Sequence, residues 1–147
     1  FLTSGGMGTM GYSLPAAIGA YFAVQEQCNT EKKEVGREIL AVMGDGAFQM
    51  SLMELATMRQ YDARVKLIVF HNGVLGLVRQ YQRTAYKDHF SMIDLTGNPD
   101  LSLLSGAYGL SYTSISSNSA VPERIREFLE KEENGILEVF VDANEVA

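Results

Sequence analysis

The stretch that decides the fold is residues 39–48, ILAVMGDGAF, in which an apolar run stops at Gly44-Asp45-Gly46. A second apolar run, residues 65–70, is followed by Asn72, which stands 27 residues after Asp45. Between the two runs, apolar residues recur at helical spacing. A strand, a helix and a strand fill this length. The two strands of such a unit lie parallel, so their carboxyl ends share one edge of the sheet.

Ligands of open α/β sheets bind at that edge. A carboxylate from Asp45 and an amide oxygen from Asn72 therefore converge where Gly44 and Gly46 allow close approach of the backbone. Hard oxygen ligands beside free N–H groups at a helix start suit Mg²⁺ shared with a diphosphate. The sequence predicts such a site here.

The rest of the chain also alternates between helical and strand patterns. We expect helices over 13–27, 75–86, from Asn98-Pro99-Asp100 onward and over 121–129, and strands over 39–43, 65–70, 110–115 and 136–141. Residues 28–38 are polar and predict an exposed loop or a frayed helix end, and residues 89–96 predict irregular structure. This alternation predicts an α/β fold, a parallel sheet with helices on both faces.

Composition narrows the class of protein. The 147 residues, 46% apolar and 20% charged, predict one soluble globular domain. A net charge of −6 without a basic stripe argues against nucleic-acid binding, and the absence of a long apolar run argues against a membrane span. A single cysteine, Cys28, and no signal peptide fit the cytoplasm.

Three segments carry a family resemblance: residues 3–20 (TSGGMGTMGYSLPAAIGA), 44–57 (GDGAFQMSLMELAT) and 71–82 (HNGVLGLVRQYQ). Together they resemble the thiamine-diphosphate (ThDP) signature and the large subunits of acetohydroxyacid (acetolactate) synthases. The resemblance runs from about Thr3 to Val141, with a gap around residues 28–37. It implies that the chain is the C-terminal ThDP-binding domain, residues 1–147, cut from a longer multidomain enzyme.

Residues 6–11, GMGTMG, also spell the dinucleotide fingerprint GxGxxG. That fingerprint needs a preceding strand and a suitably placed acid, and here only five residues precede Gly6. The resemblance explains these glycines better. It implies that the carbonyl of Gly8 binds the cofactor's aminopyrimidine and that Met10 props the cofactor in a bent shape.

The same resemblance implies a role for each residue of the sheet edge. The metal ligands would be Asp45, Asn72 and the main-chain oxygen of Val74, with Gly44, Gly46 and Ala47 completing the cofactor-binding set around the diphosphate. His71 stands where the family usually has Asn, and we interpret it as a hydrogen-bonding residue because Mg²⁺ prefers oxygen. Tyr81, where the family usually has Trp, would face the substrate cleft.

The whole enzyme would decarboxylate pyruvate and join the product to a second 2-ketoacid. No catalytic residue is expected in this chain, because the resemblance places the activating glutamate on the pyrimidine-binding domain of a second subunit. The resemblance also implies a homodimer or homotetramer and is compatible with a regulatory subunit. The resemblance leaves the FAD requirement of the full-length enzyme open, and any FAD would bind outside this domain.

Two alternatives stay open at this point. One is another ThDP-dependent enzyme, such as a 2-oxoacid decarboxylase or sulfoacetaldehyde acetyltransferase. The other is a non-catalytic module that keeps the ThDP fold and binds a partner. The intact pair Asp45 and Asn72 argues against loss of the cofactor site.

Overall fold

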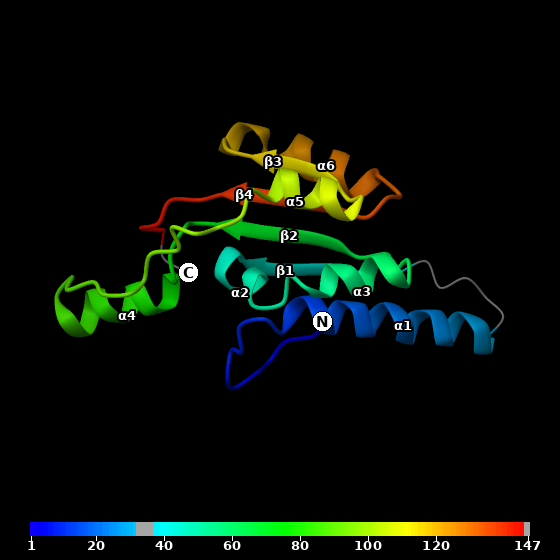
Figure 1. Cartoon of the computed structure of the whole chain (residues 1–147), viewed down its shortest axis with the longest axis horizontal. Helices are drawn as coiled ribbons and strands as arrows, with labels where there is room; N and C mark the ends of the chain where they lie inside the picture. Colours follow the sequence, from blue (N-terminus) through cyan, green and yellow to red (C-terminus); the bar gives the residue numbers. More distant parts are fainter. Residues whose placement is uncertain (32–36, 146–147) are drawn as a thin grey trace.

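Four parallel strands form the centre of the molecule (Figure 1). The computed structural model describes residues 1–31 and 37–145. The sheet has the order β1-β2-β4-β3, and every neighbouring pair is parallel. The strands are β1 (Leu40–Gly44), β2 (Lys66–His71), β3 (Ser111–Ile115) and β4 (Gly135–Phe140). The expected parallel α/β fold is therefore confirmed.

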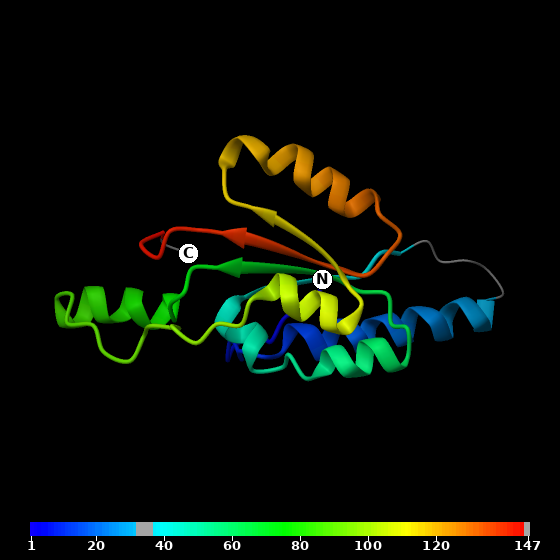
Figure 2. The ribbon, with the colours of Figure 1, turned by 45° about the horizontal axis from the view of Figure 1, so that its top comes forward.

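Helices cover both faces of this sheet, as Figure 2 shows. One face packs against α1 (Ser13–Glu31), α2 (Asp45–Gln49), α3 (Glu54–Gln60) and α5 (Leu101–Tyr108). The other face packs against α6 (Val121–Glu130), which follows the short 3₁₀ helix η1 (Asn118–Ala120). A further helix, α4 (Gly76–Tyr86), projects from the body beyond the carboxyl end of β2 (Figure 1).

Alternation along the strands divides the apolar side chains between two cores. Leu67 and Val69 point to the larger core under α1, α3 and α5, and both are fully buried. Ile68, one residue out of phase, packs on the opposite face with Phe128 of α6 and Leu137 of β4. Because the strands carry apolar side chains on both faces of the sheet, their sequences read as nearly continuous apolar runs.

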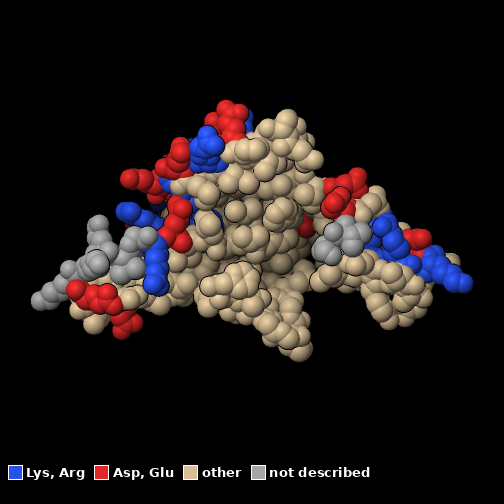
Figure 3. All heavy atoms as spheres, turned by 180° about the vertical axis from the view of Figure 1, so that it is seen from behind, with Lys and Arg blue, Asp and Glu red and all other residues tan. Residues whose placement is uncertain are grey.

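The second face is covered only in part. Leu40, Val42 and Phe70, on the β1 and β2 side of this face, are 43%, 52% and 42% exposed. Seen from behind, this side of the molecule shows a broad central area with few charged side chains, flanked by charges (Figure 3).

Two element boundaries differ from those that the patterns predict. Helix α1 continues to Glu31, because the Gln27 amide donates to the Glu31 carboxylate and the Thr30 hydroxyl donates to the Glu26 carbonyl. Residues 28–31 thus belong to the helix end that was one of the two alternatives for 28–38, and the rest of that segment lies largely outside the described residues. The single helix expected between β1 and β2 is two helices, α2 and α3, because Ser51 N–H and Glu54 N–H donate to carbonyls three residues back.

Candidate functional site at the sheet edge

The sheet register brings Asp45 and Asn72 to one edge. Gly44 ends β1 opposite Phe70 of β2, so Asp45 and Asn72 lie just beyond the carboxyl ends of neighbouring strands. The N–H of Gly73 donates to Asp45 Oδ2 at 2.9 Å and ties the two strand ends together. The expected convergence of these residues is confirmed. Their roles as metal ligands stay a prediction.

Asp45 is buried, 5% exposed, and its carboxylate is held by three N–H donors. Oδ1 accepts from the Gly46 N–H at 2.9 Å, and Oδ2 accepts from Gly73 N–H and from Asn98 Nδ2 at 2.7 Å. An ionised carboxylate offers about four acceptor positions. Oδ1 therefore keeps a position for a further donor or a cation.

Asn72 and Val74 form a tight turn beyond β2. The Val74 N–H donates to Asn72 Oδ1 at 3.0 Å, and Gly73 between them has a φ of +68°, a conformation that glycine adopts without strain. Val74 also forms an antiparallel bridge with Asp94. These contacts fix the segment that carries the amide and main-chain oxygens.

Gly46 lies against an apolar wall. A Cβ at Gly46 would come within 3.0 Å of Leu95, 3.2 Å of the Met10 methyl and 3.3 Å of Leu75. The structure therefore places Met10 beside the start of α2, with 41% of its surface exposed. Ala47 follows in the first turn of α2, where backbone N–H groups have no intrahelical partner.

Gly8 and Tyr81 lie on exposed parts of the chain. Gly8 has a φ of +60°, and its N–H donates to the Ser4 carbonyl in a turn that precedes Met10. Tyr81 is 61% exposed on α4 and stacks edge-on with Tyr86 at 5.8 Å. Their roles toward the cofactor and the substrate stay predictions.

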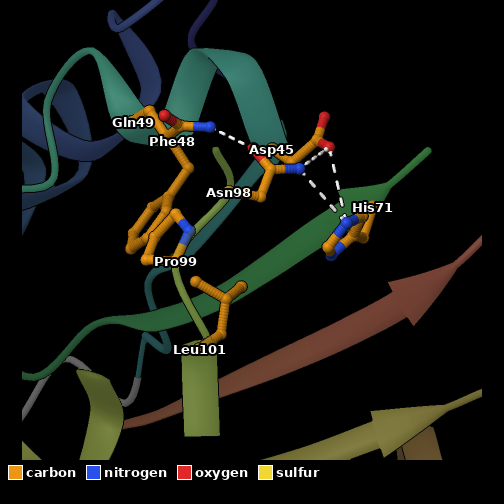
Figure 4. A pocket seen from close by; sticks show the side chains of 7 residues that line it. All are labelled: Asp45, Phe48, Gln49, His71, Asn98, Pro99 and Leu101. Atoms are coloured by element: carbon orange, nitrogen blue, oxygen red, sulfur yellow. Dashed lines mark hydrogen bonds and ion pairs between the residues drawn. The ribbon is translucent and has the colours of Figure 1, made fainter. Parts of the chain in front are cut away.

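A second set of residues lies directly behind Asp45, as Figure 4 shows for part of it. Asn98 donates to Asp45 and lies 3.2 Å from His71 Nε2, while His71 Nδ1 is 2.5 Å from the Glu138 carboxylate. The Tyr112 hydroxyl donates to the other Glu138 oxygen at 2.5 Å. His71 is therefore a hydrogen-bonding residue.

Sequence reasoning missed Asn98, Glu138 and Tyr112 as neighbours of the site. One signal was visible, because Glu138 is the only charged residue in the apolar strand β4 (GILEVF). Burial, with the Glu138 carboxylate adding to it, raises the pKa of Tyr112 to about 12. The tyrosine hydroxyl is thus protonated at neutral pH and can donate.

Within the described residues, no group of three or more His, Cys, Asp and Glu side chains could hold a metal ion. Any cation at the sheet edge would thus depend on amide and main-chain oxygens as well as Asp45. In the same part of the chain, no helix is both long and apolar enough to cross a membrane.

Several known sequences that are similar to this chain are acetolactate synthases. The chain is 37% identical to an acetolactate synthase of Arthrospira platensis over 99% of its length, which is 24% of that protein. It is 32% identical to the acetolactate synthase large subunit of Lactococcus lactis and to the isozyme 2 large subunit of Escherichia coli. These alignments cover 98% and 97% of the chain but only 23% and 24% of the relatives. The chain thus spans about a quarter of their length.

A solved structure supports the fold. Benzoylformate decarboxylase from Polynucleobacter necessarius superposes with a TM-score of 0.78 over 96% of this chain and 25% of that one, at 24% sequence identity. The family described as the C-terminal TPP-binding domain of thiamine pyrophosphate enzymes matches residues 1–139. The resemblance seen in the sequence motifs is therefore confirmed. The chain belongs to the C-terminal TPP-binding domain family of thiamine pyrophosphate enzymes, and it is similar to acetolactate synthase large subunits.

Proposed function

We propose that this chain is the domain that holds the diphosphate and Mg²⁺ of ThDP in an acetolactate synthase-like enzyme. The complete enzyme would condense pyruvate with a second 2-ketoacid to give an acetohydroxyacid. The observation that carries the proposal is the meeting of Asp45 and Asn72 beyond β1 and β2, on a chain similar to acetolactate synthases.

The residues present fit Mg²⁺. The donor set of a carboxylate, an amide and a main-chain carbonyl consists of hard oxygens only, which Mg²⁺ prefers. Asp45 retains an acceptor position on Oδ1 after its three hydrogen bonds. Asn72, Val74 and Asp45 would hold the cation, and diphosphate oxygens and water would complete its octahedron.

The surroundings of α2 fit the diphosphate and the cofactor ring. Gly44 and Gly46 keep the approach free of side chains, and any Cβ at Gly46 would crowd the wall of Leu95, Leu75 and Met10. The first-turn N–H of Ala47 is a donor for an anion at the helix start. When bound, ThDP would supply the electron sink for decarboxylation. Met10 would constrain its shape, and Gly8 would bind its aminopyrimidine.

A partner subunit is part of the proposal. Helix α4 has no buried residue, and it exposes Leu77, Val78 and Tyr81 by 72%, 42% and 61%. An amphipathic helix that buries nothing in its own domain is suited to pack against another. We assign this partner as the pyrimidine-binding domain of a second subunit, which would bring the activating glutamate and close the substrate side near Tyr81.

A second candidate is a ThDP-dependent 2-oxoacid decarboxylase or acyltransferase, since Tyr81 occupies the place where the synthases usually carry Trp. Product analysis of the complete protein separates these functions. A synthase forms acetolactate from pyruvate, whereas a decarboxylase releases acetaldehyde and CO₂. A non-catalytic module would bind ThDP and turn over neither substrate.

The test of the metal site is Asp45→Ala in the complete protein that carries this chain. We expect loss of Mg²⁺-dependent ThDP binding in calorimetric titration, because the carboxylate is the only charged member of the donor set. The matched control is Glu127→Ala, which removes an exposed carboxylate from α6. Unchanged ThDP affinity in folded Asp45→Ala would mean that Asp45 is a turn residue only.

A further inference from the structure

Glu138 is a carboxylate buried in the middle of the sheet, and the proposed binding of diphosphate and metal does not use it. It is 3% exposed, between Leu137 and Val139 on β4, and faces the core that α5 covers. A buried carboxylate is costly unless hydrogen bonds satisfy it. Its two oxygens meet His71 and Tyr112, each at 2.5 Å.

The direction of each hydrogen bond between Glu138 and Asp45 follows from which atoms can donate and which can only accept. Gln49 donates to Asn98 Oδ1, which leaves Asn98 Nδ2 to donate to Asp45 Oδ2 at 2.7 Å. The same Nδ2 lies 3.2 Å from His71 Nε2, so this ring nitrogen is the acceptor of the pair. A neutral imidazole that accepts at Nε2 carries its proton on Nδ1. That proton points at Glu138 Oε1.

The side chains between Glu138 and Asp45 contact one another directly. Asp45, His71 and Asn98 line one pocket, and Figure 4 shows the Asn98 amide in contact with both the carboxylate and the ring. His71 Nε2 is closer to Asn98 Nδ2 than to Asp45 Oδ2, which is 3.9 Å away. Phe140 stacks on the imidazole at 5.1 Å and limits its rotation. The amide of Asn98 therefore links the ring to the Asp45 carboxylate.

We propose that Glu138 and His71 are positioning residues for the Asp45 carboxylate. Glu138 selects the Nδ1–H tautomer of His71, the unprotonated Nε2 orients the Asn98 amide, and Asn98 holds Asp45 Oδ2. This leaves Oδ1 as the oxygen presented to the cation. Groups behind a metal ligand commonly tune affinity in this way. The inference rests on the proposed function for the identity of the metal.

The tautomer is measurable without metal or cofactor. In the complete protein, the ring ¹⁵N signals that disappear in a His71→Gln variant are those of His71. We expect the Nδ1–H pattern in the native protein and its loss in Glu138→Leu, which has no acceptor. Glu138→Gln should keep the pattern, because its carbonyl accepts the same hydrogen bond. A native His71 ring that carries its proton on Nε2 would overturn the proposed series of hydrogen bonds from Glu138 to Asp45.

The second readout is the Mg²⁺ concentration that gives half-maximal ThDP binding, measured by calorimetry. Glu138→Leu and Asn98→Leu should each raise it about tenfold or more. Asn98→Leu should also keep the Nδ1–H ring, since Glu138 still accepts from it. The control Glu127→Leu, on the exposed side of α6, should change neither readout.

The outcomes separate the two ideas. Native Mg²⁺ dependence that neither leucine variant changes would overturn the positioning role and leave the proposed function standing. A native protein without Mg²⁺-dependent ThDP binding would overturn the proposed function. The tautomer of His71 would still decide whether the hydrogen bonds from Glu138 to Asp45 are formed as proposed. If Glu138→Leu does not fold, the partly exposed position Asn98 carries the affinity test.

Discussion

At the scale of single residues, the position of Met10 suggests that it affects the orientation of the bound cofactor more than the affinity for it. Its methyl group lies beside Gly46 at the start of α2, and 41% of the residue is exposed, so it is not an ordinary core methionine. The proposed diphosphate and metal contacts lie on other residues. A loss at Met10 should therefore disturb the orientation of the cofactor more than its binding.

We expect Met10→Ala in the complete enzyme to lower kcat by about tenfold or more, because positioning can be worth several kcal/mol of a barrier. Affinity for ThDP should change much less. Met10→Leu should retain most activity, since bulk and apolarity are what the role requires. Steady-state kinetics with calorimetry checks both. Normal turnover in Met10→Ala would mean that the side chain only fills space.

The sequence predicted the convergence of Asp45 and Asn72 because parallel strands joined by a helix must end at one edge. It could not predict that Asn98, Glu138 and Tyr112 gather behind Asp45. These residues come from three segments far apart in the chain, and only the packing of α5 and the order β2-β4-β3 brings them together. Spacing along a chain carries no information about such contacts.

At the scale of elements, the start of β4 is tightly packed. Gly135 opens β4 opposite Ser111 of β3. A Cβ there would lie 2.3 Å from the Ser111 hydroxyl, 3.1 Å from the Phe128 ring and 3.2 Å from the Ser111 carbonyl. The hydroxyl can rotate away, but the ring and the backbone cannot move without disturbing α6 or β3.

Gly135→Ala should lower the free energy of unfolding by about 1–3 kcal/mol, the usual cost of overpacking. Gly19→Ala is the matched control, because Gly19 is an exposed position of α1 with open space around it. That substitution should raise stability by about 0.5–1 kcal/mol, since alanine favours a helix over glycine. Urea unfolding measures both changes. Equal stability of the two variants would show that β3 shifts at Ser111 and makes room for the added methyl group.

Helix α5 begins with a cap that depends on pH. Asp100 accepts from the Ser102 and Leu103 N–H groups and from the Ser102 hydroxyl. The Ser102 hydroxyl and then these backbone donors lower the pKa of Asp100 from its ordinary value of 3.8. A lowered folded pKa means that the stabilisation is complete above pH 3.8 and is lost as pH falls through the lower value.

The advantage of Asp100 over an Asp100→Asn variant should therefore shrink as the pH drops below 3.8, since asparagine caps without titrating. Thermal unfolding midpoints of the two proteins over this acidic range provide the measurement. A difference that is constant with pH would contradict a charged cap.

Most elements could be predicted because apolar runs and helical spacing reflect burial directly. The exception is the segment between β1 and β2. Leu52, Leu55 and Ala56 keep helical spacing, yet the chain turns between α2 and α3. The turn is made by backbone bonds from Ser51 and Glu54 that no side-chain pattern reveals.

At the scale of the whole molecule, the two faces of the sheet are unequally covered. The α5 side is covered by four helices, whereas Leu40, Val42 and Phe70 on the opposite side are half-exposed. Seen from behind, the centre of the molecule carries few charged side chains (Figure 3). The domain presents this face and α4 as apolar surface. Both features agree with a chain that spans about a quarter of its relatives.

The 147-residue chain alone should form no measurable acetolactate from pyruvate with added ThDP and Mg²⁺, because the activating glutamate is proposed to come from another domain. Chromatographic detection of acetolactate tests this. The complete protein under the same conditions is the positive control. Turnover of the chain near that of the complete protein would contradict a site shared between domains.

Helix α4 also makes assembly visible to amide hydrogen exchange. None of its residues is buried, and side-chain contacts such as those of Arg79 and Arg83 with Asn144 join it to the rest of the domain. Its amides should therefore exchange faster than those of the buried strands β2 and β4. Docking of a second subunit would bury Leu77 and Val78 and slow exchange over this helix alone. A protection map of α4 would then report how much of the protein is assembled at a given concentration, with no substrate present.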